Sequence, residues 1–161
     1  MAVADEGLGI AFDAGVAALK QQNDILNSIR TRASGVLAAA ALVTSFGGGL
    51  GFIRSDSLHG EAFPRWAGLL LAGVVVSIGI LAMAVQWPIR SWAYGLHPRL
   101  VIEEVDNGKD EDALRRDLTL KMAEAMVENS TRLQRCSRLY QVAVGLLVVE
   151  VLVFALALIV R

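Results

Sequence analysis

Three long apolar stretches constrain this chain more than any other feature of its sequence. They cover residues 33–53, 66–87 and 139–160, and the first two contain no Asp, Glu, Lys, Arg or His. A helix of about 20 residues is long enough to cross the roughly 30 Å hydrocarbon layer of a bilayer. We therefore predict an all-α membrane protein with three transmembrane helices, whose first partner is the lipid bilayer.

The distribution of arginine and lysine predicts the orientation of these helices. Nine basic residues lie between the second and third stretches, whereas only Arg54 and Arg65 lie between the first and second. Loops rich in Lys and Arg stay on the cytoplasmic side. We expect a bacterial cytoplasmic (inner) membrane protein with its N-terminus inside and its C-terminus outside. The net charge of −1 gives no reason to expect nucleic acid as a partner.

Apolar residues at helical spacing predict a cytoplasmic stalk. Residues 1–7 are expected to be frayed, and a helix over 8–32 should continue into the first span. A short helix should follow Pro98, and a helix from about Asp110 should fuse with the third span. The stripes that support the two long helices are Leu8, Phe12, Val16, Leu19 and Leu26, then Leu114, Leu118, Met122, Leu133, Cys136 and Tyr140. We predict that segments 8–32 and 98–138 form a helical stalk in which the two long helices pair in parallel.

One asparagine interrupts each stripe about ten residues before its span. These residues are Asn23 and Asn129, so they should lie at similar heights in a parallel pair. A buried asparagine in an apolar seam fixes the register of two helices. The alternative is that each side chain points to solvent from the edge of its stripe.

Glu150 is the only acidic or basic residue in the three apolar stretches. A charge at a helix centre costs about 2.5 to 3.5 kcal/mol, which the apolar residues of the third span outweigh at roughly 0.3 to 0.6 kcal/mol each. Thr44, Ser45 and Ser77 are expected at comparable depth and could hydrogen-bond to its carboxyl group. We favour a polar contact between helices, because a single acid makes a poor relay. The alternative is an ion or proton path, or a sensor of conformational change.

The remaining polar residues suggest no catalytic chemistry. The basic run Arg132, Arg135 and Arg138 suits snorkelling at the membrane surface, or binding of anionic lipid or of a nucleotide signal. His59 and His97 are isolated. We expect no nucleophile–base pair, no metal site and no cofactor, and therefore no enzyme. Cys136 falls on an apolar stripe and is expected to pack in the interior.

The stretch from Pro98 to Val160 carries the core of a family resemblance that covers most of the chain. The segments are LHPRLVIEEV, DALRRDLTLKMAEAMVENSTRLQRCSRLYQ and VAVGLLVVEVLVFALAL. They resemble small actinobacterial integral membrane proteins and, more distantly, the SLATT and Pycsar-type transmembrane effector domains. This resemblance implies an oligomerising inner-membrane effector or pore-forming component in nucleotide-signalled bacterial defence, acting as a homo-oligomer.

The chain departs from those effectors because it has no room for a separate nucleotide-sensing domain. Either a soluble signalling partner or the cytoplasmic helices would have to receive the signal. The alternative function is a non-conducting membrane adaptor that anchors a soluble partner through its cytoplasmic helices.

Overall fold

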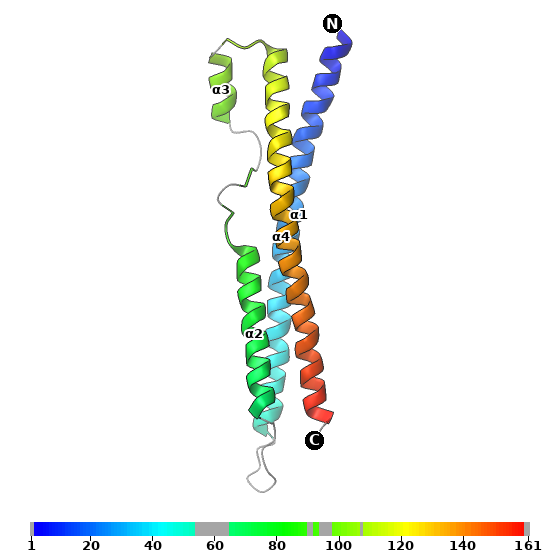
Figure 1. Ribbon diagram of the computed structural model, residues 1–161, viewed down its shortest axis with the longest axis vertical. Coiled ribbons are helices and arrows are strands. Elements are labelled where there is room, and N and C mark those ends of the chain that lie inside the picture. The colour runs from blue at the N-terminus through cyan, green and yellow to red at the C-terminus, as the bar shows by residue number, and fades with distance from the viewer. Residues whose placement is uncertain (1, 54–64, 90–91, 94–97, 107, 160–161) are drawn as a thin grey trace. The chain divides into compact units, whose positions relative to one another are not determined.

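The computed structural model describes the chain except residues 1, 54–64, 90–91, 94–97, 107 and 160–161. The described residues form four helices and no strand, which confirms the all-α prediction (Figure 1). These helices are α1 (Ala2–Ile53), α2 (Arg65–Gln86), α3 (Pro98–Asp106) and α4 (Glu111–Ile159).

The two long helices are continuous, as predicted. α1 has 52 residues and α4 has 49, and neither contains a proline. The expectation that residues 1–7 are frayed is wrong for the described part, because α1 already begins at Ala2.

Local chemistry sets the boundaries between the shorter elements. Pro88 follows α2 and disfavours helical geometry in the preceding residue. Gly108 has a φ of 75° after α3, a left-handed conformation that glycine adopts at helix ends, and its N–H donates to the carbonyl of Val105 at 3.0 Å. Asp110 then caps α4, because its Oδ1 accepts from the N–H of Ala113 at 3.0 Å.

The chain divides into two compact units, each built from segments distant in sequence. Unit 1 consists of Met1–Asn27 and Pro88–Arg135, and unit 2 consists of Ser28–Trp87 and Cys136–Arg161. The first part of α1 and the first part of α4 thus belong to unit 1, and their remaining parts belong to unit 2.

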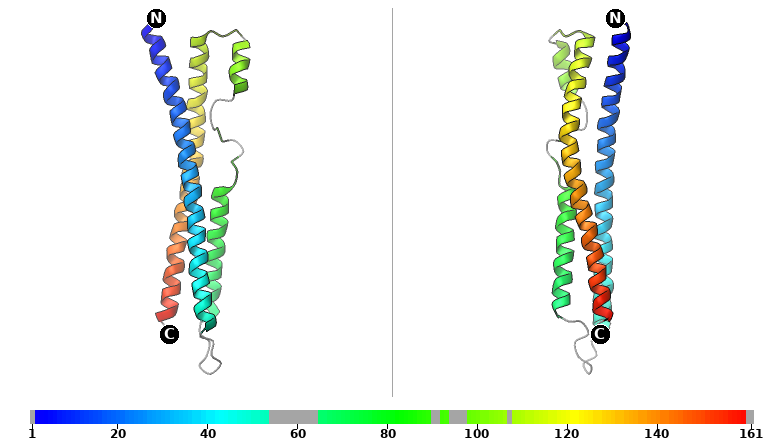
Figure 2. Two further views of the ribbon diagram at one scale, coloured as in Figure 1. Left: turned by 180° about the vertical axis from the view of Figure 1, so that it is seen from behind. Right: turned by 45° about the vertical axis from the view of Figure 1, so that its right-hand side comes forward.

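In unit 1, α1 and α4 run side by side in the same direction, as the blue and yellow segments of Figures 1 and 2 show. Gln22 Nε2 donates to the carbonyl of Met126 at 3.1 Å. Nearer the N-terminus, a Cβ placed on Gly15 would lie 2.9 Å from Met122 Cε. The interior also contains Leu19, Leu26, Trp92, Leu118 and Asn129.

The prediction for the inner face of α1 is wrong at one position, where Gly15 is buried in place of Val16. Val16 was expected on the inner face of α1, but its side chain is 46% exposed, whereas Gly15 is buried. The absence of a Cβ at Gly15 leaves room for the long side chain of Met122. Close approach of the two helices therefore decides this position, because a pattern of apolar side chains cannot reveal a buried glycine.

Unit 2 contains three helical segments. α1 and α4 again run in the same direction and α2 runs opposite to them (Figures 1 and 2). Gln86 Nε2, at the end of α2, donates to Ser34 Oγ at 3.2 Å. The buried cluster consists of Val36, Ala40, Ile78 and Ala143, so every helical segment contributes to it.

Buried residues along α4 recur every seven positions. They are Met122 and Asn129 in unit 1, and Cys136, Ala143, Glu150 and Ala157 in unit 2. In α1, Leu19 and Leu26 in unit 1 and Ala33 and Ala40 in unit 2 follow the same spacing. A strict seven-residue repeat is typical of parallel helices that pack as in a left-handed coiled coil.

Candidate functional site

Two helices in the described part of the chain are long and apolar enough to cross a membrane, by length and composition. They are Gly68–Gln86 in α2 and Glu111–Ala157 in α4. Only 17% and 11% of their most apolar windows are buried inside the structure. Apolar helices in the core of a soluble protein would be mostly buried, so these two present their apolar side chains outward.

The predicted span over residues 33–53 is not one of these two candidates. It coincides with the final part of α1, and the side chains of residues 47–53 are not described. The glycines of that segment and the loop over 54–64 therefore lie outside the described side chains. A third span stays a prediction.

The carboxyl group of Glu150 lies inside unit 2. The side chain is 1% exposed, and it occupies a position of the seven-residue repeat between Ala143 and Ala157. Its Oε1 is 3.0 Å from Thr44 Oγ1 on α1. Its Oε2 is buried and has no hydrogen-bond partner. The contact joins α1 to α4 in an otherwise apolar interior.

The number of protons at this contact suits a neutral acid. Thr44 Oγ1 is also 2.9 Å from the carbonyl of Ala40, which can only accept. The hydroxyl has one proton, so two full hydrogen bonds require the Glu150 carboxyl group to donate the second. An ionised carboxylate would in addition leave the charged Oε2 without a donor, which is costly in an apolar interior.

The other two hydroxyl groups of the predicted polar cluster bond within their own helices. Ser45 Oγ donates to the carbonyl of Ala41 at 2.7 Å, and Ser77 Oγ donates to the carbonyl of Gly73 at 2.8 Å. Hydroxyl groups in helices commonly bond in this way to the carbonyl one turn earlier. The structure therefore brings Glu150 together with Thr44, whereas Ser45 and Ser77 bond locally.

Asn129 has a partner that the sequence did not suggest. Its side chain is 1% exposed, its Nδ2 donates to the carbonyl of Ala93 at 2.9 Å, and its Oδ1 accepts from the N–H of Ala93 at 3.3 Å. Asn23 is partly buried on α1. Trp92 is 6% exposed and lies in the interior of unit 1. Asn129 thus holds the backbone of Ala93, a non-helical residue between α2 and α3.

Sequence reasoning missed three polar residues that join segments. Gln22 bonds to α4 in unit 1, and Gln86 bonds to Ser34 in unit 2. Arg30 Nη2 donates to the carbonyl of Trp87 at 3.4 Å. For Gln22 the available signal was its position next to Asn23, the polar residue that interrupts the predicted stripe of α1.

The predicted basic run is divided between the units. In unit 1, Arg132 forms an ion pair with Glu128 one turn earlier, and Arg135 is exposed. In unit 2, Arg138 is exposed. His59 and His97 lie outside the described residues. The described part of the chain contains no group of three or more His, Cys, Asp or Glu that could hold a metal ion. Cys136 is a buried thiol.

Comparison with protein-family models, with curated proteins and with solved structures finds no match for this chain.

Proposed function

We propose that this chain is an integral protein of the bacterial cytoplasmic membrane that self-associates and permeabilises the bilayer as an effector. Its three spans are residues 33–53, 66–87 and 139–160, and its N-terminal and 98–138 segments lie in the cytoplasm. The observation that carries the membrane part of this proposal is the outward-facing apolar surface of unit 2.

That surface is too apolar for water. Fifteen large apolar side chains in the described part of unit 2 are exposed: Leu37, Leu42, Phe46, Leu69, Leu70, Val76, Ile80, Met83, Trp87, Val142, Val148, Val149, Val151, Leu152 and Leu156. Full burial of one such side chain stabilises by roughly 1.5 to 3 kcal/mol. The burial free energy that these partly exposed side chains leave unused in water is comparable to the 5 to 15 kcal/mol that typically stabilises a whole domain. Lipid covers such a surface without this cost.

The composition of α1 supports the third span. Its residues 33–46 contain no charge, and Leu37, Leu42 and Phe46 are exposed on it. The positions of three arginines support the proposed orientation in the membrane. Arg30, Arg32 and Arg138 belong to unit 2 and lie just outside the apolar segments. The positive-inside rule assigns that end to the cytoplasm.

A second repeat along α4 supports self-association. The exposed residues Arg138, Val142, Gly145, Val149, Leu152 and Leu156 follow alternating steps of four and three. This is the spacing of a helix-pairing seam. Nothing in the structure would contact a Cβ on Gly145, so another helix could approach closely there. In this proposal Glu150 stabilises each subunit, and the copies together form the conducting path.

Dye release from vesicles tests the effector function. Purified protein reconstituted at increasing protein-to-lipid ratios should release an encapsulated dye, with a dependence on protein concentration steeper than linear. Gly145→Leu should reduce both chemical cross-linking and release. Gly73→Leu is the matched control, because Gly73 is an exposed glycine on α2 that likewise has nothing near its Cβ position. Vesicles that stay tight at every ratio would exclude permeabilisation.

A membrane adaptor is the second candidate, and α3 favours it. Ile102 and Val105 on this helix are exposed, beside the exposed acidic residues Glu103 and Asp106. A soluble signalling partner could cover this small amphipathic face. In that case the vesicles stay tight, and Ile102→Lys with Val105→Lys releases a co-purifying soluble protein while the chain remains in the membrane.

A further inference from the structure

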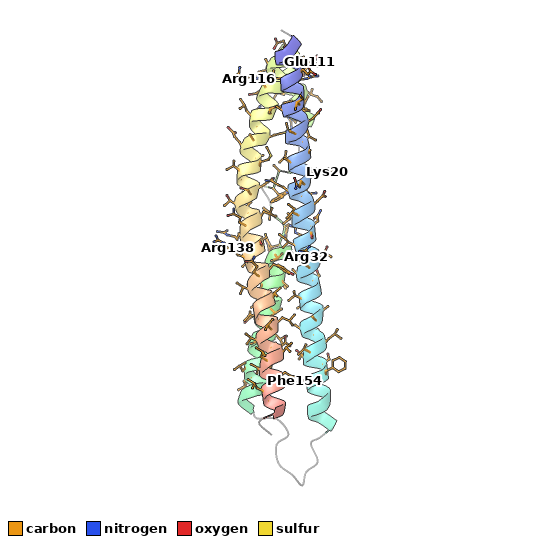
Figure 3. All side chains as sticks on the ribbon, turned by 90° about the vertical axis from the view of Figure 1, so that its right-hand side faces the viewer. Lys20, Arg32, Glu111, Arg116, Arg138 and Phe154 are labelled. Carbon is orange, nitrogen blue, oxygen red and sulfur yellow. The ribbon has the colours of Figure 1, made fainter. Side chains whose placement is uncertain are left out.

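Three arginines lie at one end of unit 2. Arg30 and Arg32 are on α1, six and four residues before the buried Val36, and Arg138 is on α4, two residues after the buried Cys136. Figure 3 labels Arg32 and Arg138, whose side chains project outward from different helices at the same end of the unit. Arg30 reaches the end of α2, where it donates to the carbonyl of Trp87. Two of the three helical segments therefore carry arginines at this end, and the third, α2, is followed by the residue that Arg30 contacts.

Arg30 is anchored at the end of α2 by a hydrogen bond from its guanidinium group. Its Nη2 donates to the Trp87 carbonyl at 3.4 Å, and its Nε is buried without a partner. Beside it, the Trp87 side chain is 66% exposed. A planar guanidinium group matches the geometry of phosphate oxygens, and tryptophan is enriched where headgroups meet hydrocarbon.

The charges of unit 2 are not balanced at this end. The acidic side chain described in unit 2 is Glu150, which lies twelve residues beyond Arg138 on α4, about 18 Å along the helix. In unit 1, by contrast, several of the described basic residues have acidic partners: Arg115 with Glu111 at 2.7 Å, Lys121 with Asp117 at 3.1 Å, and Arg132 with Glu128.

We infer that Arg30, Arg32 and Arg138 form a collar that binds the phosphate groups of anionic phospholipids in the leaflet at this end of unit 2. This inference rests on the proposed membrane insertion. The headgroups supply the negative charge that the described part of unit 2 lacks at this end, while the acyl chains cover the adjacent apolar side chains. The collar therefore gives the protein a preference for anionic over zwitterionic lipid.

Spin-labelled lipids measure this preference directly. The wild-type chain is reconstituted in phosphatidylcholine, and the protein-bound fractions of labelled phosphatidylglycerol and labelled phosphatidylcholine are compared. One basic residue near an anionic surface contributes a factor of about five in affinity. Arg32→Gln with Arg138→Gln should therefore reduce the relative affinity for phosphatidylglycerol by about 25-fold. Arg32→Lys with Arg138→Lys should retain most of it, because the charge remains.

The matched control removes two basic residues from unit 1. Lys20→Gln with Arg116→Gln changes the net charge equally at exposed positions labelled in Figure 3, and it should leave the lipid preference unchanged. An equal loss in this control would overturn the inference, since it would show a diffuse charge effect. Unchanged preference in the Arg32 and Arg138 glutamine variant would also overturn it.

Inorganic phosphate distinguishes a lipid site from a site for free phosphate. Millimolar phosphate should not displace labelled phosphatidylglycerol from the wild-type chain at constant ionic strength, and displacement would overturn the lipid assignment. Failure of the wild-type chain to enter vesicles would instead contradict the proposed function. Entry with no preference between the two lipids would contradict the collar alone.

Discussion

Replacing Thr44 by Val removes the hydroxyl group that contacts Glu150 while keeping nearly the same side-chain shape. The contact spans 3.0 Å between α1 and α4, and the second carboxyl oxygen has no other partner in the described structure. Polar contacts between helices in lipid contribute about 0.6 kcal/mol on average and about 1.7 kcal/mol at most. Thr44→Val should therefore lower the free energy of unfolding by about 0.6 to 1.7 kcal/mol.

A double-mutant cycle separates this contact from the local bond of Thr44 to Ala40. Glu150→Leu replaces a buried polar group by an apolar one of similar size, and such replacements are commonly neutral or stabilising. With Leu at position 150, Thr44→Val should have almost no effect. The coupling free energy should again be about 0.6 to 1.7 kcal/mol, because the contact is lost only once.

Unfolding in mixed micelles with increasing dodecyl sulfate, followed by circular dichroism, measures these values. Ser77→Ala is the matched control, since the Ser77 hydroxyl bonds to Gly73 on its own helix, and it should show no coupling to Glu150→Leu. A Thr44–Glu150 coupling of zero would refute the argument that this contact stabilises the helix pair. Loss of dye release in a fully folded Glu150→Gln variant would instead indicate an ion or proton path.

Three further predictions concern unit 1. Asn129→Leu should lower the free energy of unfolding by about 1 to 3 kcal/mol, because it leaves the N–H and carbonyl groups of Ala93 without their side-chain partner. In a variant whose single tryptophan is Trp92, the same substitution should shift the tryptophan fluorescence to longer wavelength. Unchanged fluorescence would contradict the contact. A hydrogen bond from Lys121 lowers the pKa of Asp117 below its ordinary value. Its stabilising contribution should therefore be complete above that ordinary value and lost as the pH falls through the lowered pKa, so acid titrations of stability should differ between wild type and Asp117→Asn only in this acidic range. Gly15→Leu should cost about 1 to 3 kcal/mol in thermal or denaturant unfolding because it overpacks the contact with α4, whereas Gly7→Leu, where a Cβ would meet nothing within 4 Å, should not.

Several features of the fold follow from the sequence because they depend on local chemistry. The absence of proline from residues 2–53 and 111–159 predicts the two long uninterrupted helices. Pro98 and Gly108 predict the start and the end of the short helix α3. Most of the α4 stripe was also predictable, since a helix that buries one face repeats its apolar residues every three or four positions. Leu118, Met122 and Cys136 are buried, as that stripe indicates.

Other features depend on distances between segments that no local pattern records. Gly15 is buried where Val16 was expected, because the inner face is decided by how closely the helices approach. Asn129 bonds to the backbone of Ala93. A pattern of side-chain types cannot predict a backbone partner, because every residue has the same backbone groups. The expected depth in the membrane suggested three hydroxyl groups as hydrogen-bond partners of Glu150. The packing of α1 against α4 brings Thr44 into contact with its carboxyl group.

The sequence by itself therefore determined the helical composition, the continuity of the long helices and the presence of long apolar segments, because proline, glycine and hydrophobic spacing act within a few residues along the chain. The tertiary structure decided which apolar faces remain exposed and which polar atoms meet. Those outcomes depend on the register between segments about a hundred residues apart, as between Thr44 and Glu150, and this register is a property of packing.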